Sequence, residues 1–393
     1  MKAGNQTLLK KNNQRAITDF IINNGPISRA DLSKKLNISK PTVSANITEL
    51  MEMNLLMEIG YSATDIGKKP MLVDFNKDFQ YVLALDFISY YIRNKISVAI
   101  CNLYCEPIFI ETITLPENYS GQILRDYVPQ TLRDMLRRNE LDPHKIGRLV
   151  LTAPTIEYNS NYVKFECRNG DLINLVDVFL PYFKDKIAVK NDIDLAALGE
   201  KYFGVGRDVD DLFFAWISLG IGGGIILDGK LREGKRQVGG ELAYNTVYNE
   251  ATKRFEYFRD VTDMGGIRNY INANRSKAAK SMISERLLNG DVTLDLMIEA
   301  AQQGDGFCIE FGRFIGKTAA IAVANICNTL DVEMAIIGGD YLNFGEVFLS
   351  EFRNRITTLP IGNTKVSTPF YTNSAMYGAF KFGTESIIAG LIQ

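Results

Sequence analysis

The chain of 393 residues carries 44 basic and 46 acidic side chains, a single histidine and five cysteines, and 46% of it is hydrophobic. This composition predicts two or three folded domains and excludes disordered, collagen-like and low-complexity proteins. Apolar runs are too short for a membrane span, the N-terminus lacks the apolar core of a secretion signal, and no two cysteines form a CxxC pair. We therefore expect a cytoplasmic protein that has no membrane partner and no disulfide framework.

Charge divides the chain into two parts. Residues 1–76 hold ten basic and seven acidic side chains, a net charge of +3, whereas the remainder holds 34 and 39, a net charge of −5. A small cationic module joined to a larger acidic body is typical of proteins that contact nucleic acid through one domain. We therefore predict a domain boundary near residue 76.

The pattern of residues 1–53 predicts three helices. The first spans Thr7–Asn23 and ends where the glycine and proline of Asn23–Pro26 terminate it. Ser28 can cap a second helix, Arg29–Leu36, and Asn37 suits the tight turn that follows. Ser39 can cap the third helix, which has a proline in its first turn. The predicted apolar side of the first helix consists of Leu8, Leu9, Ile17, Phe20 and Ile21, and that of the other two consists of Leu32, Leu36, Ile38, Val43, Ile47 and Leu50.

The third helix has the composition of a DNA recognition helix. Its predicted outward face offers small hydrogen-bonding groups, a methyl group and one cation, which suit close approach to base edges in a major groove. We assign base contacts to Thr42, Ser44 and Asn46 and phosphate contacts to Lys40. Arg29 and Ser39 complete the helical part of the predicted DNA surface.

A wing is predicted after the third helix. Leu55–Gly60 and Pro70–Phe75 have the pattern of two short strands, and the loop between them ends in Lys68 and Lys69, which we assign to phosphates or a minor groove. Residues 1–76 are thus predicted to be a winged helix-turn-helix (α+β) domain. The alternative is a small helical interaction module with a solvated lysine pair.

Residues 77–393 alternate between strand-like and helical stretches. This order predicts an α/β architecture rather than a bundle or a sandwich. The predicted strands are Tyr81–Asp86, Ile96–Asn102, Ile108–Thr114, Arg148–Leu151, Lys186–Lys190, Leu212–Ser218, Gly224–Leu227 and Ala335–Ile337, and the predicted helices are Gln122–Arg138, Leu195–Phe203 and most of 294–330.

Three motifs in this body can carry chemistry, and each has a purely structural alternative. The glycines of Ser218–Gly224, with Gly222 and Gly223 at their centre, can bring N–H groups to an anion or a sugar, or simply form a hairpin turn. Asn191 and Asp192 can hold sugar hydroxyls or cap a helix. Glu241 and Tyr244, in the segment Gly239–Tyr244, can offer a carboxylate and a phenol or belong to a solvated loop.

Together these motifs resemble the ROK family (repressors, open reading frames and sugar kinases) in its transcription-factor branch. Gly67-Lys-Lys-Pro70 is similar to the Gly-Arg-Arg-Pro wing of such repressors, and Asn191-Asp-Ile-Asp-Leu-Ala-Ala-Leu-Gly-Glu200 to the family segment Asn-Asp-Ala-Asn-Ala-Ala-Ala-Leu-Gly-Glu. Ser218–Gly224 resembles the family's second phosphate hairpin, Gly240-Glu241 its Gly-Glu pair, and Asp331–Gly339 its late strand and glycine pair.

The resemblance implies a two-lobed, actin-like (ribonuclease H-like) sugar-kinase fold for residues 77–393. One lobe would comprise about 77–190 with the C-terminal helix, and the other about 191–375. Asn191, Asp192 and Glu241 would line a sugar pocket in the cleft between the lobes.

The sequence also departs from the family pattern. Bulky side chains fill Asp86–Tyr91, where family kinases hold ATP phosphates with a glycine hairpin, so we expect no kinase activity. Tyr244 stands in place of the family's zinc-binding histidine and Lys253–Thr262 contains no cysteine, so we expect no metal and no cofactor. Asp263 replaces the next sugar-binding glutamate of the family.

The resulting hypothesis is a transcriptional regulator, a repressor of carbohydrate genes, that binds a double-stranded DNA operator as a homodimer or homotetramer. A sugar or sugar derivative in the cleft would alter its affinity for the operator. Its rivals are a ligand-independent DNA-binding scaffold with a decayed cleft and an ATP-dependent sugar kinase.

Overall fold

The computed structural model describes residues 2–61, 69–87, 94–153, 158–159, 162–357 and 364–392. The chain forms two compact units. The first contains the residues up to Leu151, a segment that ends at Val189, and the C-terminal residues from Phe380, and the second is mainly Lys190–Ala379. Among the described residues, no helix combines the length and the apolar character needed to cross a bilayer.

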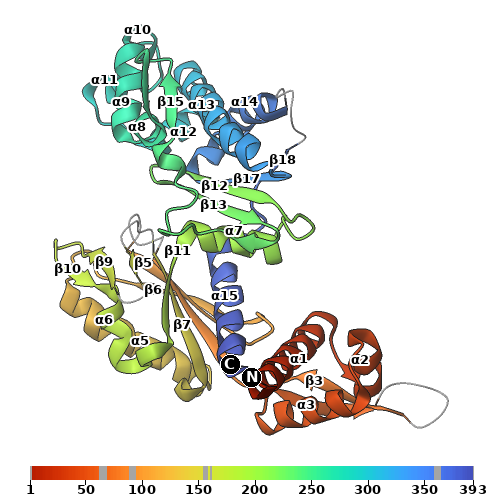
Figure 1. Ribbon diagram of the computed structural model, residues 1–393. Coiled ribbons are helices and arrows are strands. Elements are labelled where there is room, and N and C mark those ends of the chain that lie inside the picture. The colour runs from red at the N-terminus through yellow and green to blue at the C-terminus, as the bar shows by residue number, and fades with distance from the viewer. Residues whose placement is uncertain are drawn as a thin grey trace. The chain divides into compact units, whose positions relative to one another are not determined.

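The N-terminal part of the first unit is a winged helix-turn-helix, as predicted (Figure 1). Ser28 caps the second helix and Ser39 the third, each accepting a hydrogen bond from a backbone N–H three residues later. Asn37 adopts the left-handed conformation, with φ of 54°, in the turn between them. The elements are α1 (Lys2–Asn24), β1 (Ile27–Ser28), α2 (Arg29–Leu36), α3 (Lys40–Glu52), β2 (Leu56–Tyr61) and β3 (Met71–Phe75).

The first helix of this head begins at Lys2, five residues before its predicted start, and two further details differ from the sequence prediction. The assignment of Leu8 and Leu9 to the buried side of α1 is wrong, because these side chains are 58% and 61% exposed. The core begins further along the helix, where Ile17 and Ile21 are fully buried. The short strand β1 was not predicted; it pairs with β3 and so completes a three-stranded sheet of order β1-β3-β2.

The body of the first unit is built on a five-stranded sheet of order β11-β7-β4-β5-β6. Its strands β4, β5 and β6, all three predicted from the sequence, form an antiparallel meander. The elements are β4 (Tyr81–Asp86), β5 (Lys95–Cys101), β6 (Pro107–Thr114), α5 (Gly121–Arg138), η1 (Pro143–Lys145), β7 (Ile146–Ala153), β8 (Tyr158–Asn159), β9 (Tyr162–Glu166), β10 (Leu172–Asn174), α6 (Leu175–Phe183), η2 (Lys184–Lys186) and β11 (Ile187–Asn191).

The second unit is a layered α/β structure around a sheet of order β14-β13-β12-β17-β18. Strand β12 pairs antiparallel with β13 and parallel with β17. Its elements are α7 (Asp192–Tyr202), β12 (Leu212–Ile217), β13 (Ile221–Leu227), β14 (Lys230–Leu231), η3 (Leu242–Tyr244), β15 (Thr246–Asn249), β16 (Arg254–Tyr257), α8 (Phe258–Thr262), α9 (Met264–Ala273), α10 (Arg275–Ala278), α11 (Ser284–Asn289), α12 (Leu294–Gln302), α13 (Gly306–Leu330), β17 (Met334–Gly338), η4 (Asp340–Phe344), α14 (Glu346–Thr357) and β18 (Lys365–Ser367). The last helix, α15 (Ser374–Leu391), begins in the second unit and, from Phe380 on, belongs to the first.

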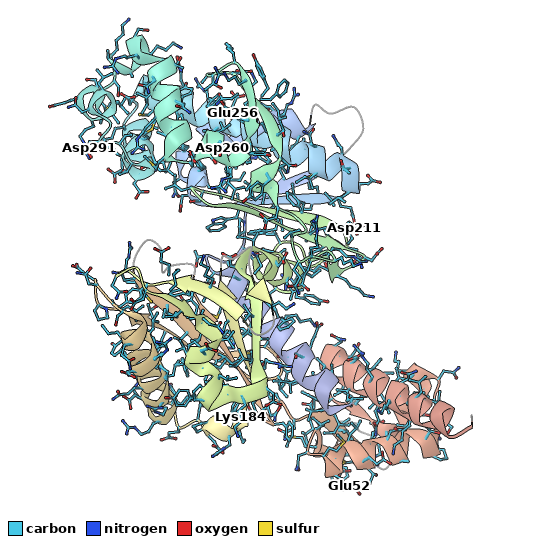
Figure 2. The ribbon with its side chains drawn as sticks, turned by 60° about the vertical axis from the view of Figure 1, so that its left-hand side comes forward. Glu52, Lys184, Asp211, Glu256, Asp260 and Asp291 are labelled. Carbon is cyan, nitrogen blue, oxygen red and sulfur yellow. The ribbon has the colours of Figure 1, made fainter. Side chains whose placement is uncertain are left out.

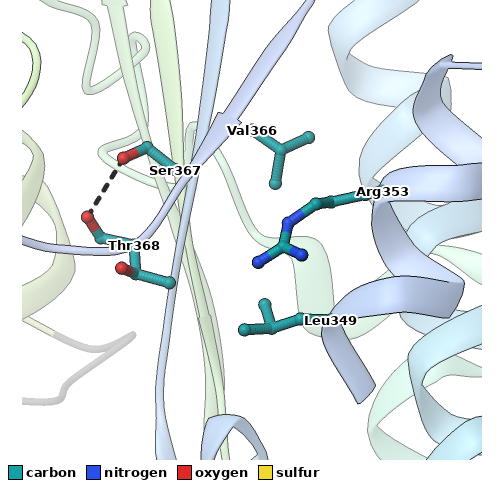
Figure 3. A pocket seen from close by; sticks show the side chains of 5 residues that line it. All are labelled: Leu349, Arg353, Val366, Ser367 and Thr368. Atoms are coloured by element: carbon teal, nitrogen blue, oxygen red, sulfur yellow. Dashed lines mark hydrogen bonds between the residues drawn. The ribbon is translucent and has the colours of Figure 1, made fainter. Parts of the chain in front are cut away.

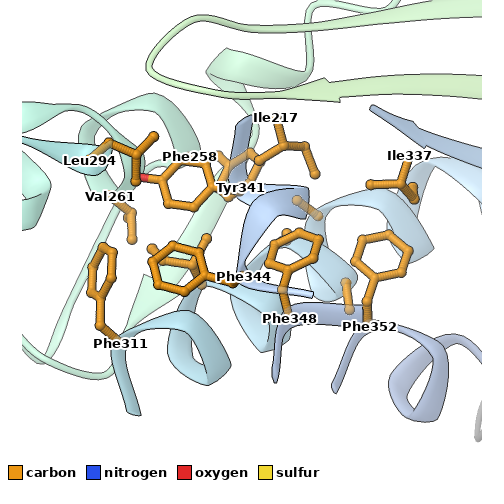
Figure 4. Close-up of a cluster of buried hydrophobic side chains, with 14 of the residues drawn as sticks. Ile217, Phe258, Val261, Leu294, Phe311, Ile337, Tyr341, Phe344, Phe348 and Phe352 are labelled. Atoms are coloured by element: carbon orange, nitrogen blue, oxygen red, sulfur yellow. The ribbon is translucent and has the colours of Figure 1, made fainter. Parts of the chain in front are cut away.

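Aromatic side chains dominate the core on one face of this sheet (Figure 4). Phe311 of α13, Phe344 of η4 and Phe348 of α14 are buried there, with Ile217 and Ile337 from the strands. Helix α7 packs on the opposite face, where it contacts β13. The start of α7 is thereby fixed against the sheet, and this helix start carries two of the predicted effector residues.

Candidate DNA interface and effector site

The exposed face of α3 is polar and small, as a recognition helix requires. Lys40, Ser44 and Thr48 are exposed, and Thr42 is half-buried. The hydroxyls of Ser39 and Thr42 lie 2.8 Å apart at the helix start, so both stand at the end that a recognition helix directs at base edges.

Asn46 is not part of this face, and the prediction that it contacts a base is wrong. Its side chain is 4% exposed, and its Nδ2 donates to the carbonyl oxygen of Thr42 at 2.7 Å. Asn46 follows Val43 by three positions and precedes Leu50 by four, which places it on the buried side of the helix. Ala45 and Thr48 occupy the exposed positions around it.

Arg29 is engaged within the head. Its guanidinium donates to the carbonyl oxygen of Ser44 and the hydroxyl of Thr48, both at 3.3 Å, and lies 3.4 Å from Glu58 of β2. These contacts join the start of α2 to α3 and to the wing sheet. Arg29 therefore orients the recognition helix in the free protein, and its predicted contact with DNA stays a prediction.

The wing strands form as predicted, but the tip of the wing lies partly outside the described residues. β2 and β3 pair antiparallel, with a register shift between Glu58 and Gly60. Lys69 is exposed just before β3. Lys68 falls outside the described residues.

Asn191 and Asp192 open α7 at the end of β11. The Asn191 side chain accepts hydrogen bonds from the backbone N–H groups of Ile193 and Asp194, at 2.8 and 3.1 Å. Asp192 is 4% exposed. The structural alternative of an N-cap is therefore correct for Asn191, and this cap fixes the helix turn that carries Asp192.

The glycine motif lies in a strand rather than in a turn. Gly222 and Gly223 were predicted to bend the backbone, but both lie inside β13, opposite Trp216 and Ala215 of β12. The turn is shorter and sits at Ser218–Gly220. A Cβ at Gly222 would lie 2.8 Å from the side chain of Ile193, so this glycine permits the close approach of α7. The placement of these two glycines in the turn is therefore wrong, and their predicted contact with an effector stays a prediction.

Glu241 follows a loop that lies against β13. Gly240 has φ of +83°, and a Cβ there would collide with the carbonyl group of Gly223, so only glycine fits at this approach. Burial raises the pKa of the half-buried Glu241 carboxyl above its ordinary value. The loop therefore places a partly desolvated acid next to its contact with β13.

Asp194 is a further carboxyl beside Asp192 and Glu241, and it was not among the predicted effector residues. Burial, with the charge of Glu233 next in importance, raises its pKa to about 8, and Asp192 and Glu241 act in the same direction. Asp192, Asp194, Glu233 and Glu241 therefore form one electrostatic group, which we call the acidic cluster. One signal was present in the sequence, because the fourth residue of the Asn191–Glu200 segment is an acid where the family pattern has an amide.

The side chain of Tyr244 contacts Arg259 and Tyr257, which lie outside the acidic cluster. Its hydroxyl accepts a hydrogen bond from Arg259 at 3.2 Å, and its ring packs edge-on against Tyr257 at 5.9 Å. Asp263 caps α9 by accepting from the backbone N–H of Gly266 at 2.8 Å. Both predicted effector residues thus have structural partners, and the effector roles assigned to them stay predictions.

The hairpin β15–β16 occupies the part of the chain in which the family's zinc ligands would stand. Glu256, labelled in Figure 2, accepts hydrogen bonds from the side chains of Asn249 and Thr252, both at 2.7 Å. These bonds join the two ends of the hairpin turn to one another. Among the described residues, no group of three or more potential ligands is arranged to hold a metal ion.

Asp340 stands beside the segment that resembles a phosphate hairpin. Its carboxylate accepts a hydrogen bond from the Ser218 hydroxyl, at the ends of the parallel strands β12 and β17. A carboxylate at this point would repel a nucleotide phosphate. In the first unit, Phe87 is fully buried and packs on Phe165 at 5.4 Å, at the start of the segment where kinases place glycines. Ile88–Tyr91, the rest of that stretch, falls outside the described residues.

A separate hollow of about 220 Å³ lies beside the edge strand β18 (Figure 3). Arg353 of α14 projects into it and is held by Glu346 at 3.0 Å. None of the predicted effector residues lines this hollow. It is lined by Leu349, Arg353, Val366, Ser367 and Thr368.

Comparison with known proteins decides the family. Residues 93–382 match the ROK family, and residues 11–57 match a winged helix-turn-helix DNA-binding domain. The chain belongs to the ROK family. This ROK protein therefore combines a DNA-binding head with the family's kinase-like body, as the sequence predicted.

Its relatives include named repressors. The xylose repressor of Caldicellulosiruptor bescii is 28% identical over 370 residues, which cover 90% of this chain and 89% of that repressor. The DNA-binding transcriptional dual regulator NagC of Escherichia coli is 23% identical, with 99% of this chain and 96% of NagC covered.

Solved structures confirm the fold of this ROK protein. A ROK family transcriptional regulator described as a homolog of the E. coli MLC protein has a TM-score of 0.76 at 21% identity, over 98% of both chains. A ROK family glucokinase from Streptomyces griseus, in complex with glucose and AMPPNP, has a TM-score of 0.58 at 20% identity, over 77% of this chain and 98% of the glucokinase.

Proposed function

We propose that this ROK protein is a sugar-responsive transcriptional repressor. The exposed face of α3 is the observation that carries the proposal: it is small and polar, is capped by Ser39, and is held by Arg29 against the wing sheet. Such a face serves base reading and has no use in sugar phosphorylation. Relatives named as repressors, aligned over nearly the whole chain, support the same function.

The effector is proposed to be a carbohydrate that binds at the start of α7. Asp192 and Glu241 supply acceptors for sugar hydroxyls, and the Asn191 cap holds the helix turn on which Asp192 stands. The names of the xylose and N-acetylglucosamine repressors support a carbohydrate effector. We expect a homodimer or homotetramer, since paired heads would match paired half-sites on DNA.

The experiment is a selection of bound fragments from a genomic DNA library, followed by fluorescence anisotropy on the enriched sequence. We expect a sequence-specific complex that a Thr42→Ala/Ser44→Ala double variant loses, while the variant keeps its melting temperature. Enrichment of no sequence, or equal binding by the double variant, would contradict a DNA-reading role for α3.

Kinase activity is the rival that Asp192 favours, because a carboxylate at this position can take a proton from a sugar hydroxyl. Against it stands the Asp340 carboxylate beside Ser218. A coupled assay of ATP consumption with a panel of pentoses and hexoses separates the two functions. We expect no sugar-dependent turnover, and clear turnover would replace the repressor proposal with a bifunctional enzyme.

A further inference from the structure

Asp194 is a buried acid with an unmet hydrogen-bonding requirement. Its side chain is 4% exposed, and its Oδ1 is buried and has no hydrogen-bond partner among the residues that the structure describes. Helix capping does not explain it, because the cap of α7 is the Asn191 side chain, which accepts from the backbone N–H of Asp194. A buried carboxylate oxygen without a donor is costly, so the site is incomplete without a further group.

The charges around Asp194 indicate which kind of group would complete its hydrogen bonding. Glu233, Asp192 and Glu241 all disfavour ionisation of Asp194, and Lys190 favours it. The Lys190 ammonium is already engaged by Glu233 at 2.7 Å, in a pair of which both side chains are mostly buried. The acidic cluster therefore keeps an excess of negative charge, which a cationic donor would neutralise.

Two kinds of cation can supply such a group. A divalent metal ion needs several oxygens converging on one point, and no such set is present among the residues that the structure describes. An ammonium group carries three donors and one charge, and it accepts looser geometry. We propose that the effector carries a protonated amine, which binds at the acidic cluster and takes the place of the proton that Asp194 holds in the free protein, so that the ionised Asp194 carboxylate becomes its principal acceptor.

This inference rests on the proposed sugar effector and makes it specific. A neutral hydroxyl can donate only one hydrogen bond and leaves the charge of the cluster uncompensated. The acid at position 194, where the family segment has an amide, would therefore bind an amino sugar more tightly than its neutral counterpart.

The test is isothermal titration calorimetry at pH 7 with three matched sets of ligands: glucose, galactose and mannose, their 2-amino forms, and their 2-acetamido forms. Acetylation removes the charge and leaves the sugar ring unchanged. The proteins are the wild type, Asp194→Asn, and Asp295→Asn as a control. Asp295 is also an acid in the first turn of a helix, but it is exposed and belongs to α12.

We expect one amino sugar to bind at least about tenfold more tightly than its hydroxyl and acetamido counterparts, because the bond is charge-assisted. Asp194→Asn should abolish this preference and Asp295→Asn should keep it, with both variants folded by circular dichroism. If a sugar and its 2-amino and 2-acetamido forms bind with equal affinity, the proposal that the effector carries an amine is wrong, while the proposal of a sugar effector is retained. Absence of binding by all nine sugars would contradict the sugar effector itself.

A metal arm completes the test. Titration with Mg²⁺ and Ca²⁺ should show no binding that depends on Asp194. Binding of either ion to the wild type, lost in Asp194→Asn, would overturn the amine in favour of a cation site.

Discussion

Individual side chains in this ROK protein separate into those that hold the structure and those that face a ligand, and the residue type alone does not tell them apart. Ser44 and Asn46 are both polar and lie two positions apart on α3. Ser44 is exposed, whereas Asn46 is buried and bonds to the carbonyl oxygen of Thr42. The helical repeat decides the difference, since Asn46 falls on the stripe of Val43 and Leu50.

We predict opposite effects for the two residues. Ser44→Ala should weaken operator binding by about 1 kcal/mol or more, because a base contact is lost, with the melting temperature unchanged. Asn46→Ala should lower the free energy of unfolding by about 1 kcal/mol, because a buried hydrogen bond is lost. Anisotropy on the operator and urea denaturation measure the two quantities. A stability loss in Ser44→Ala, together with unaltered operator affinity, would contradict the assignment.

Asp194 gives the protein a pH dependence. Its pKa is about 8 in the folded chain against 3.8 as the ordinary value, so between these limits the folded state holds a proton that the unfolded state has released. The free energy of unfolding should therefore fall as pH rises from about 4 to about 8, by on the order of 2–5 kcal/mol, and level off above that range.

Asp194→Asn should remove this decline, since the amide does not titrate. Urea unfolding of both proteins at pH 5, 7 and 9 measures the difference between them. Parallel curves for the two proteins would show that Asp194 ionises normally in the folded state.

At the scale of elements, the glycines of β13 show how a packing requirement can resemble a binding motif. A Cβ at Gly224 would lie 2.6 Å from the Cβ of Ala197 and 2.8 Å from the carbonyl oxygen of Ile193. The strand therefore cannot carry a side chain at the point where α7 crosses it. For Gly220, in the turn before the strand, no atom of the described residues lies within 4 Å of the position that a Cβ would take.

This contrast supplies a matched pair of variants. Gly224→Ala should lower the free energy of unfolding by about 1–3 kcal/mol, because α7 must move away from the strand. Gly220→Ala should change it by less than about 0.5 kcal/mol. Denaturant titrations of the two variants measure both values, and similar losses would mean that the close approach of α7 does not limit this position.

The wing offers a second test at this scale. Lys69→Gln should reduce the dependence of operator affinity on salt by about one unit of slope, because one phosphate contact is lost. Lys280→Gln is the control, since Lys280 is exposed in the second unit. Affinities measured between 50 and 300 mM salt give the slopes. An unchanged slope for Lys69→Gln would show that this lysine does not contact DNA.

At the scale of the whole molecule, the sequence predicted elements that depend on local pattern and missed what depends on packing. Tyr81–Asp86 forms the strand expected from its continuous apolar run, and Ser28 and Ser39 cap helices as their positions required. The placement of β13 failed because glycine is read as a turn signal, while the contact that requires glycine comes from a distant helix. Asp194 was missed because its burial arises only when α7 packs on the sheet.

The proposed regulator joins a DNA-reading head to a proposed effector site in a kinase-like body. Coupling between the two must be reciprocal: if the effector weakens operator binding by some factor, the operator weakens effector binding by the same factor. Allosteric coupling between two sites typically changes affinity by a factor of about 5 to 150.

The most direct measurement is calorimetric titration of the effector, taken from the sugar panel, into the free protein and into its operator complex. We predict that the effector dissociation constant rises on the complex by the factor by which the effector weakens operator binding in anisotropy. Equal effector affinities for the free and the operator-bound protein would contradict the account.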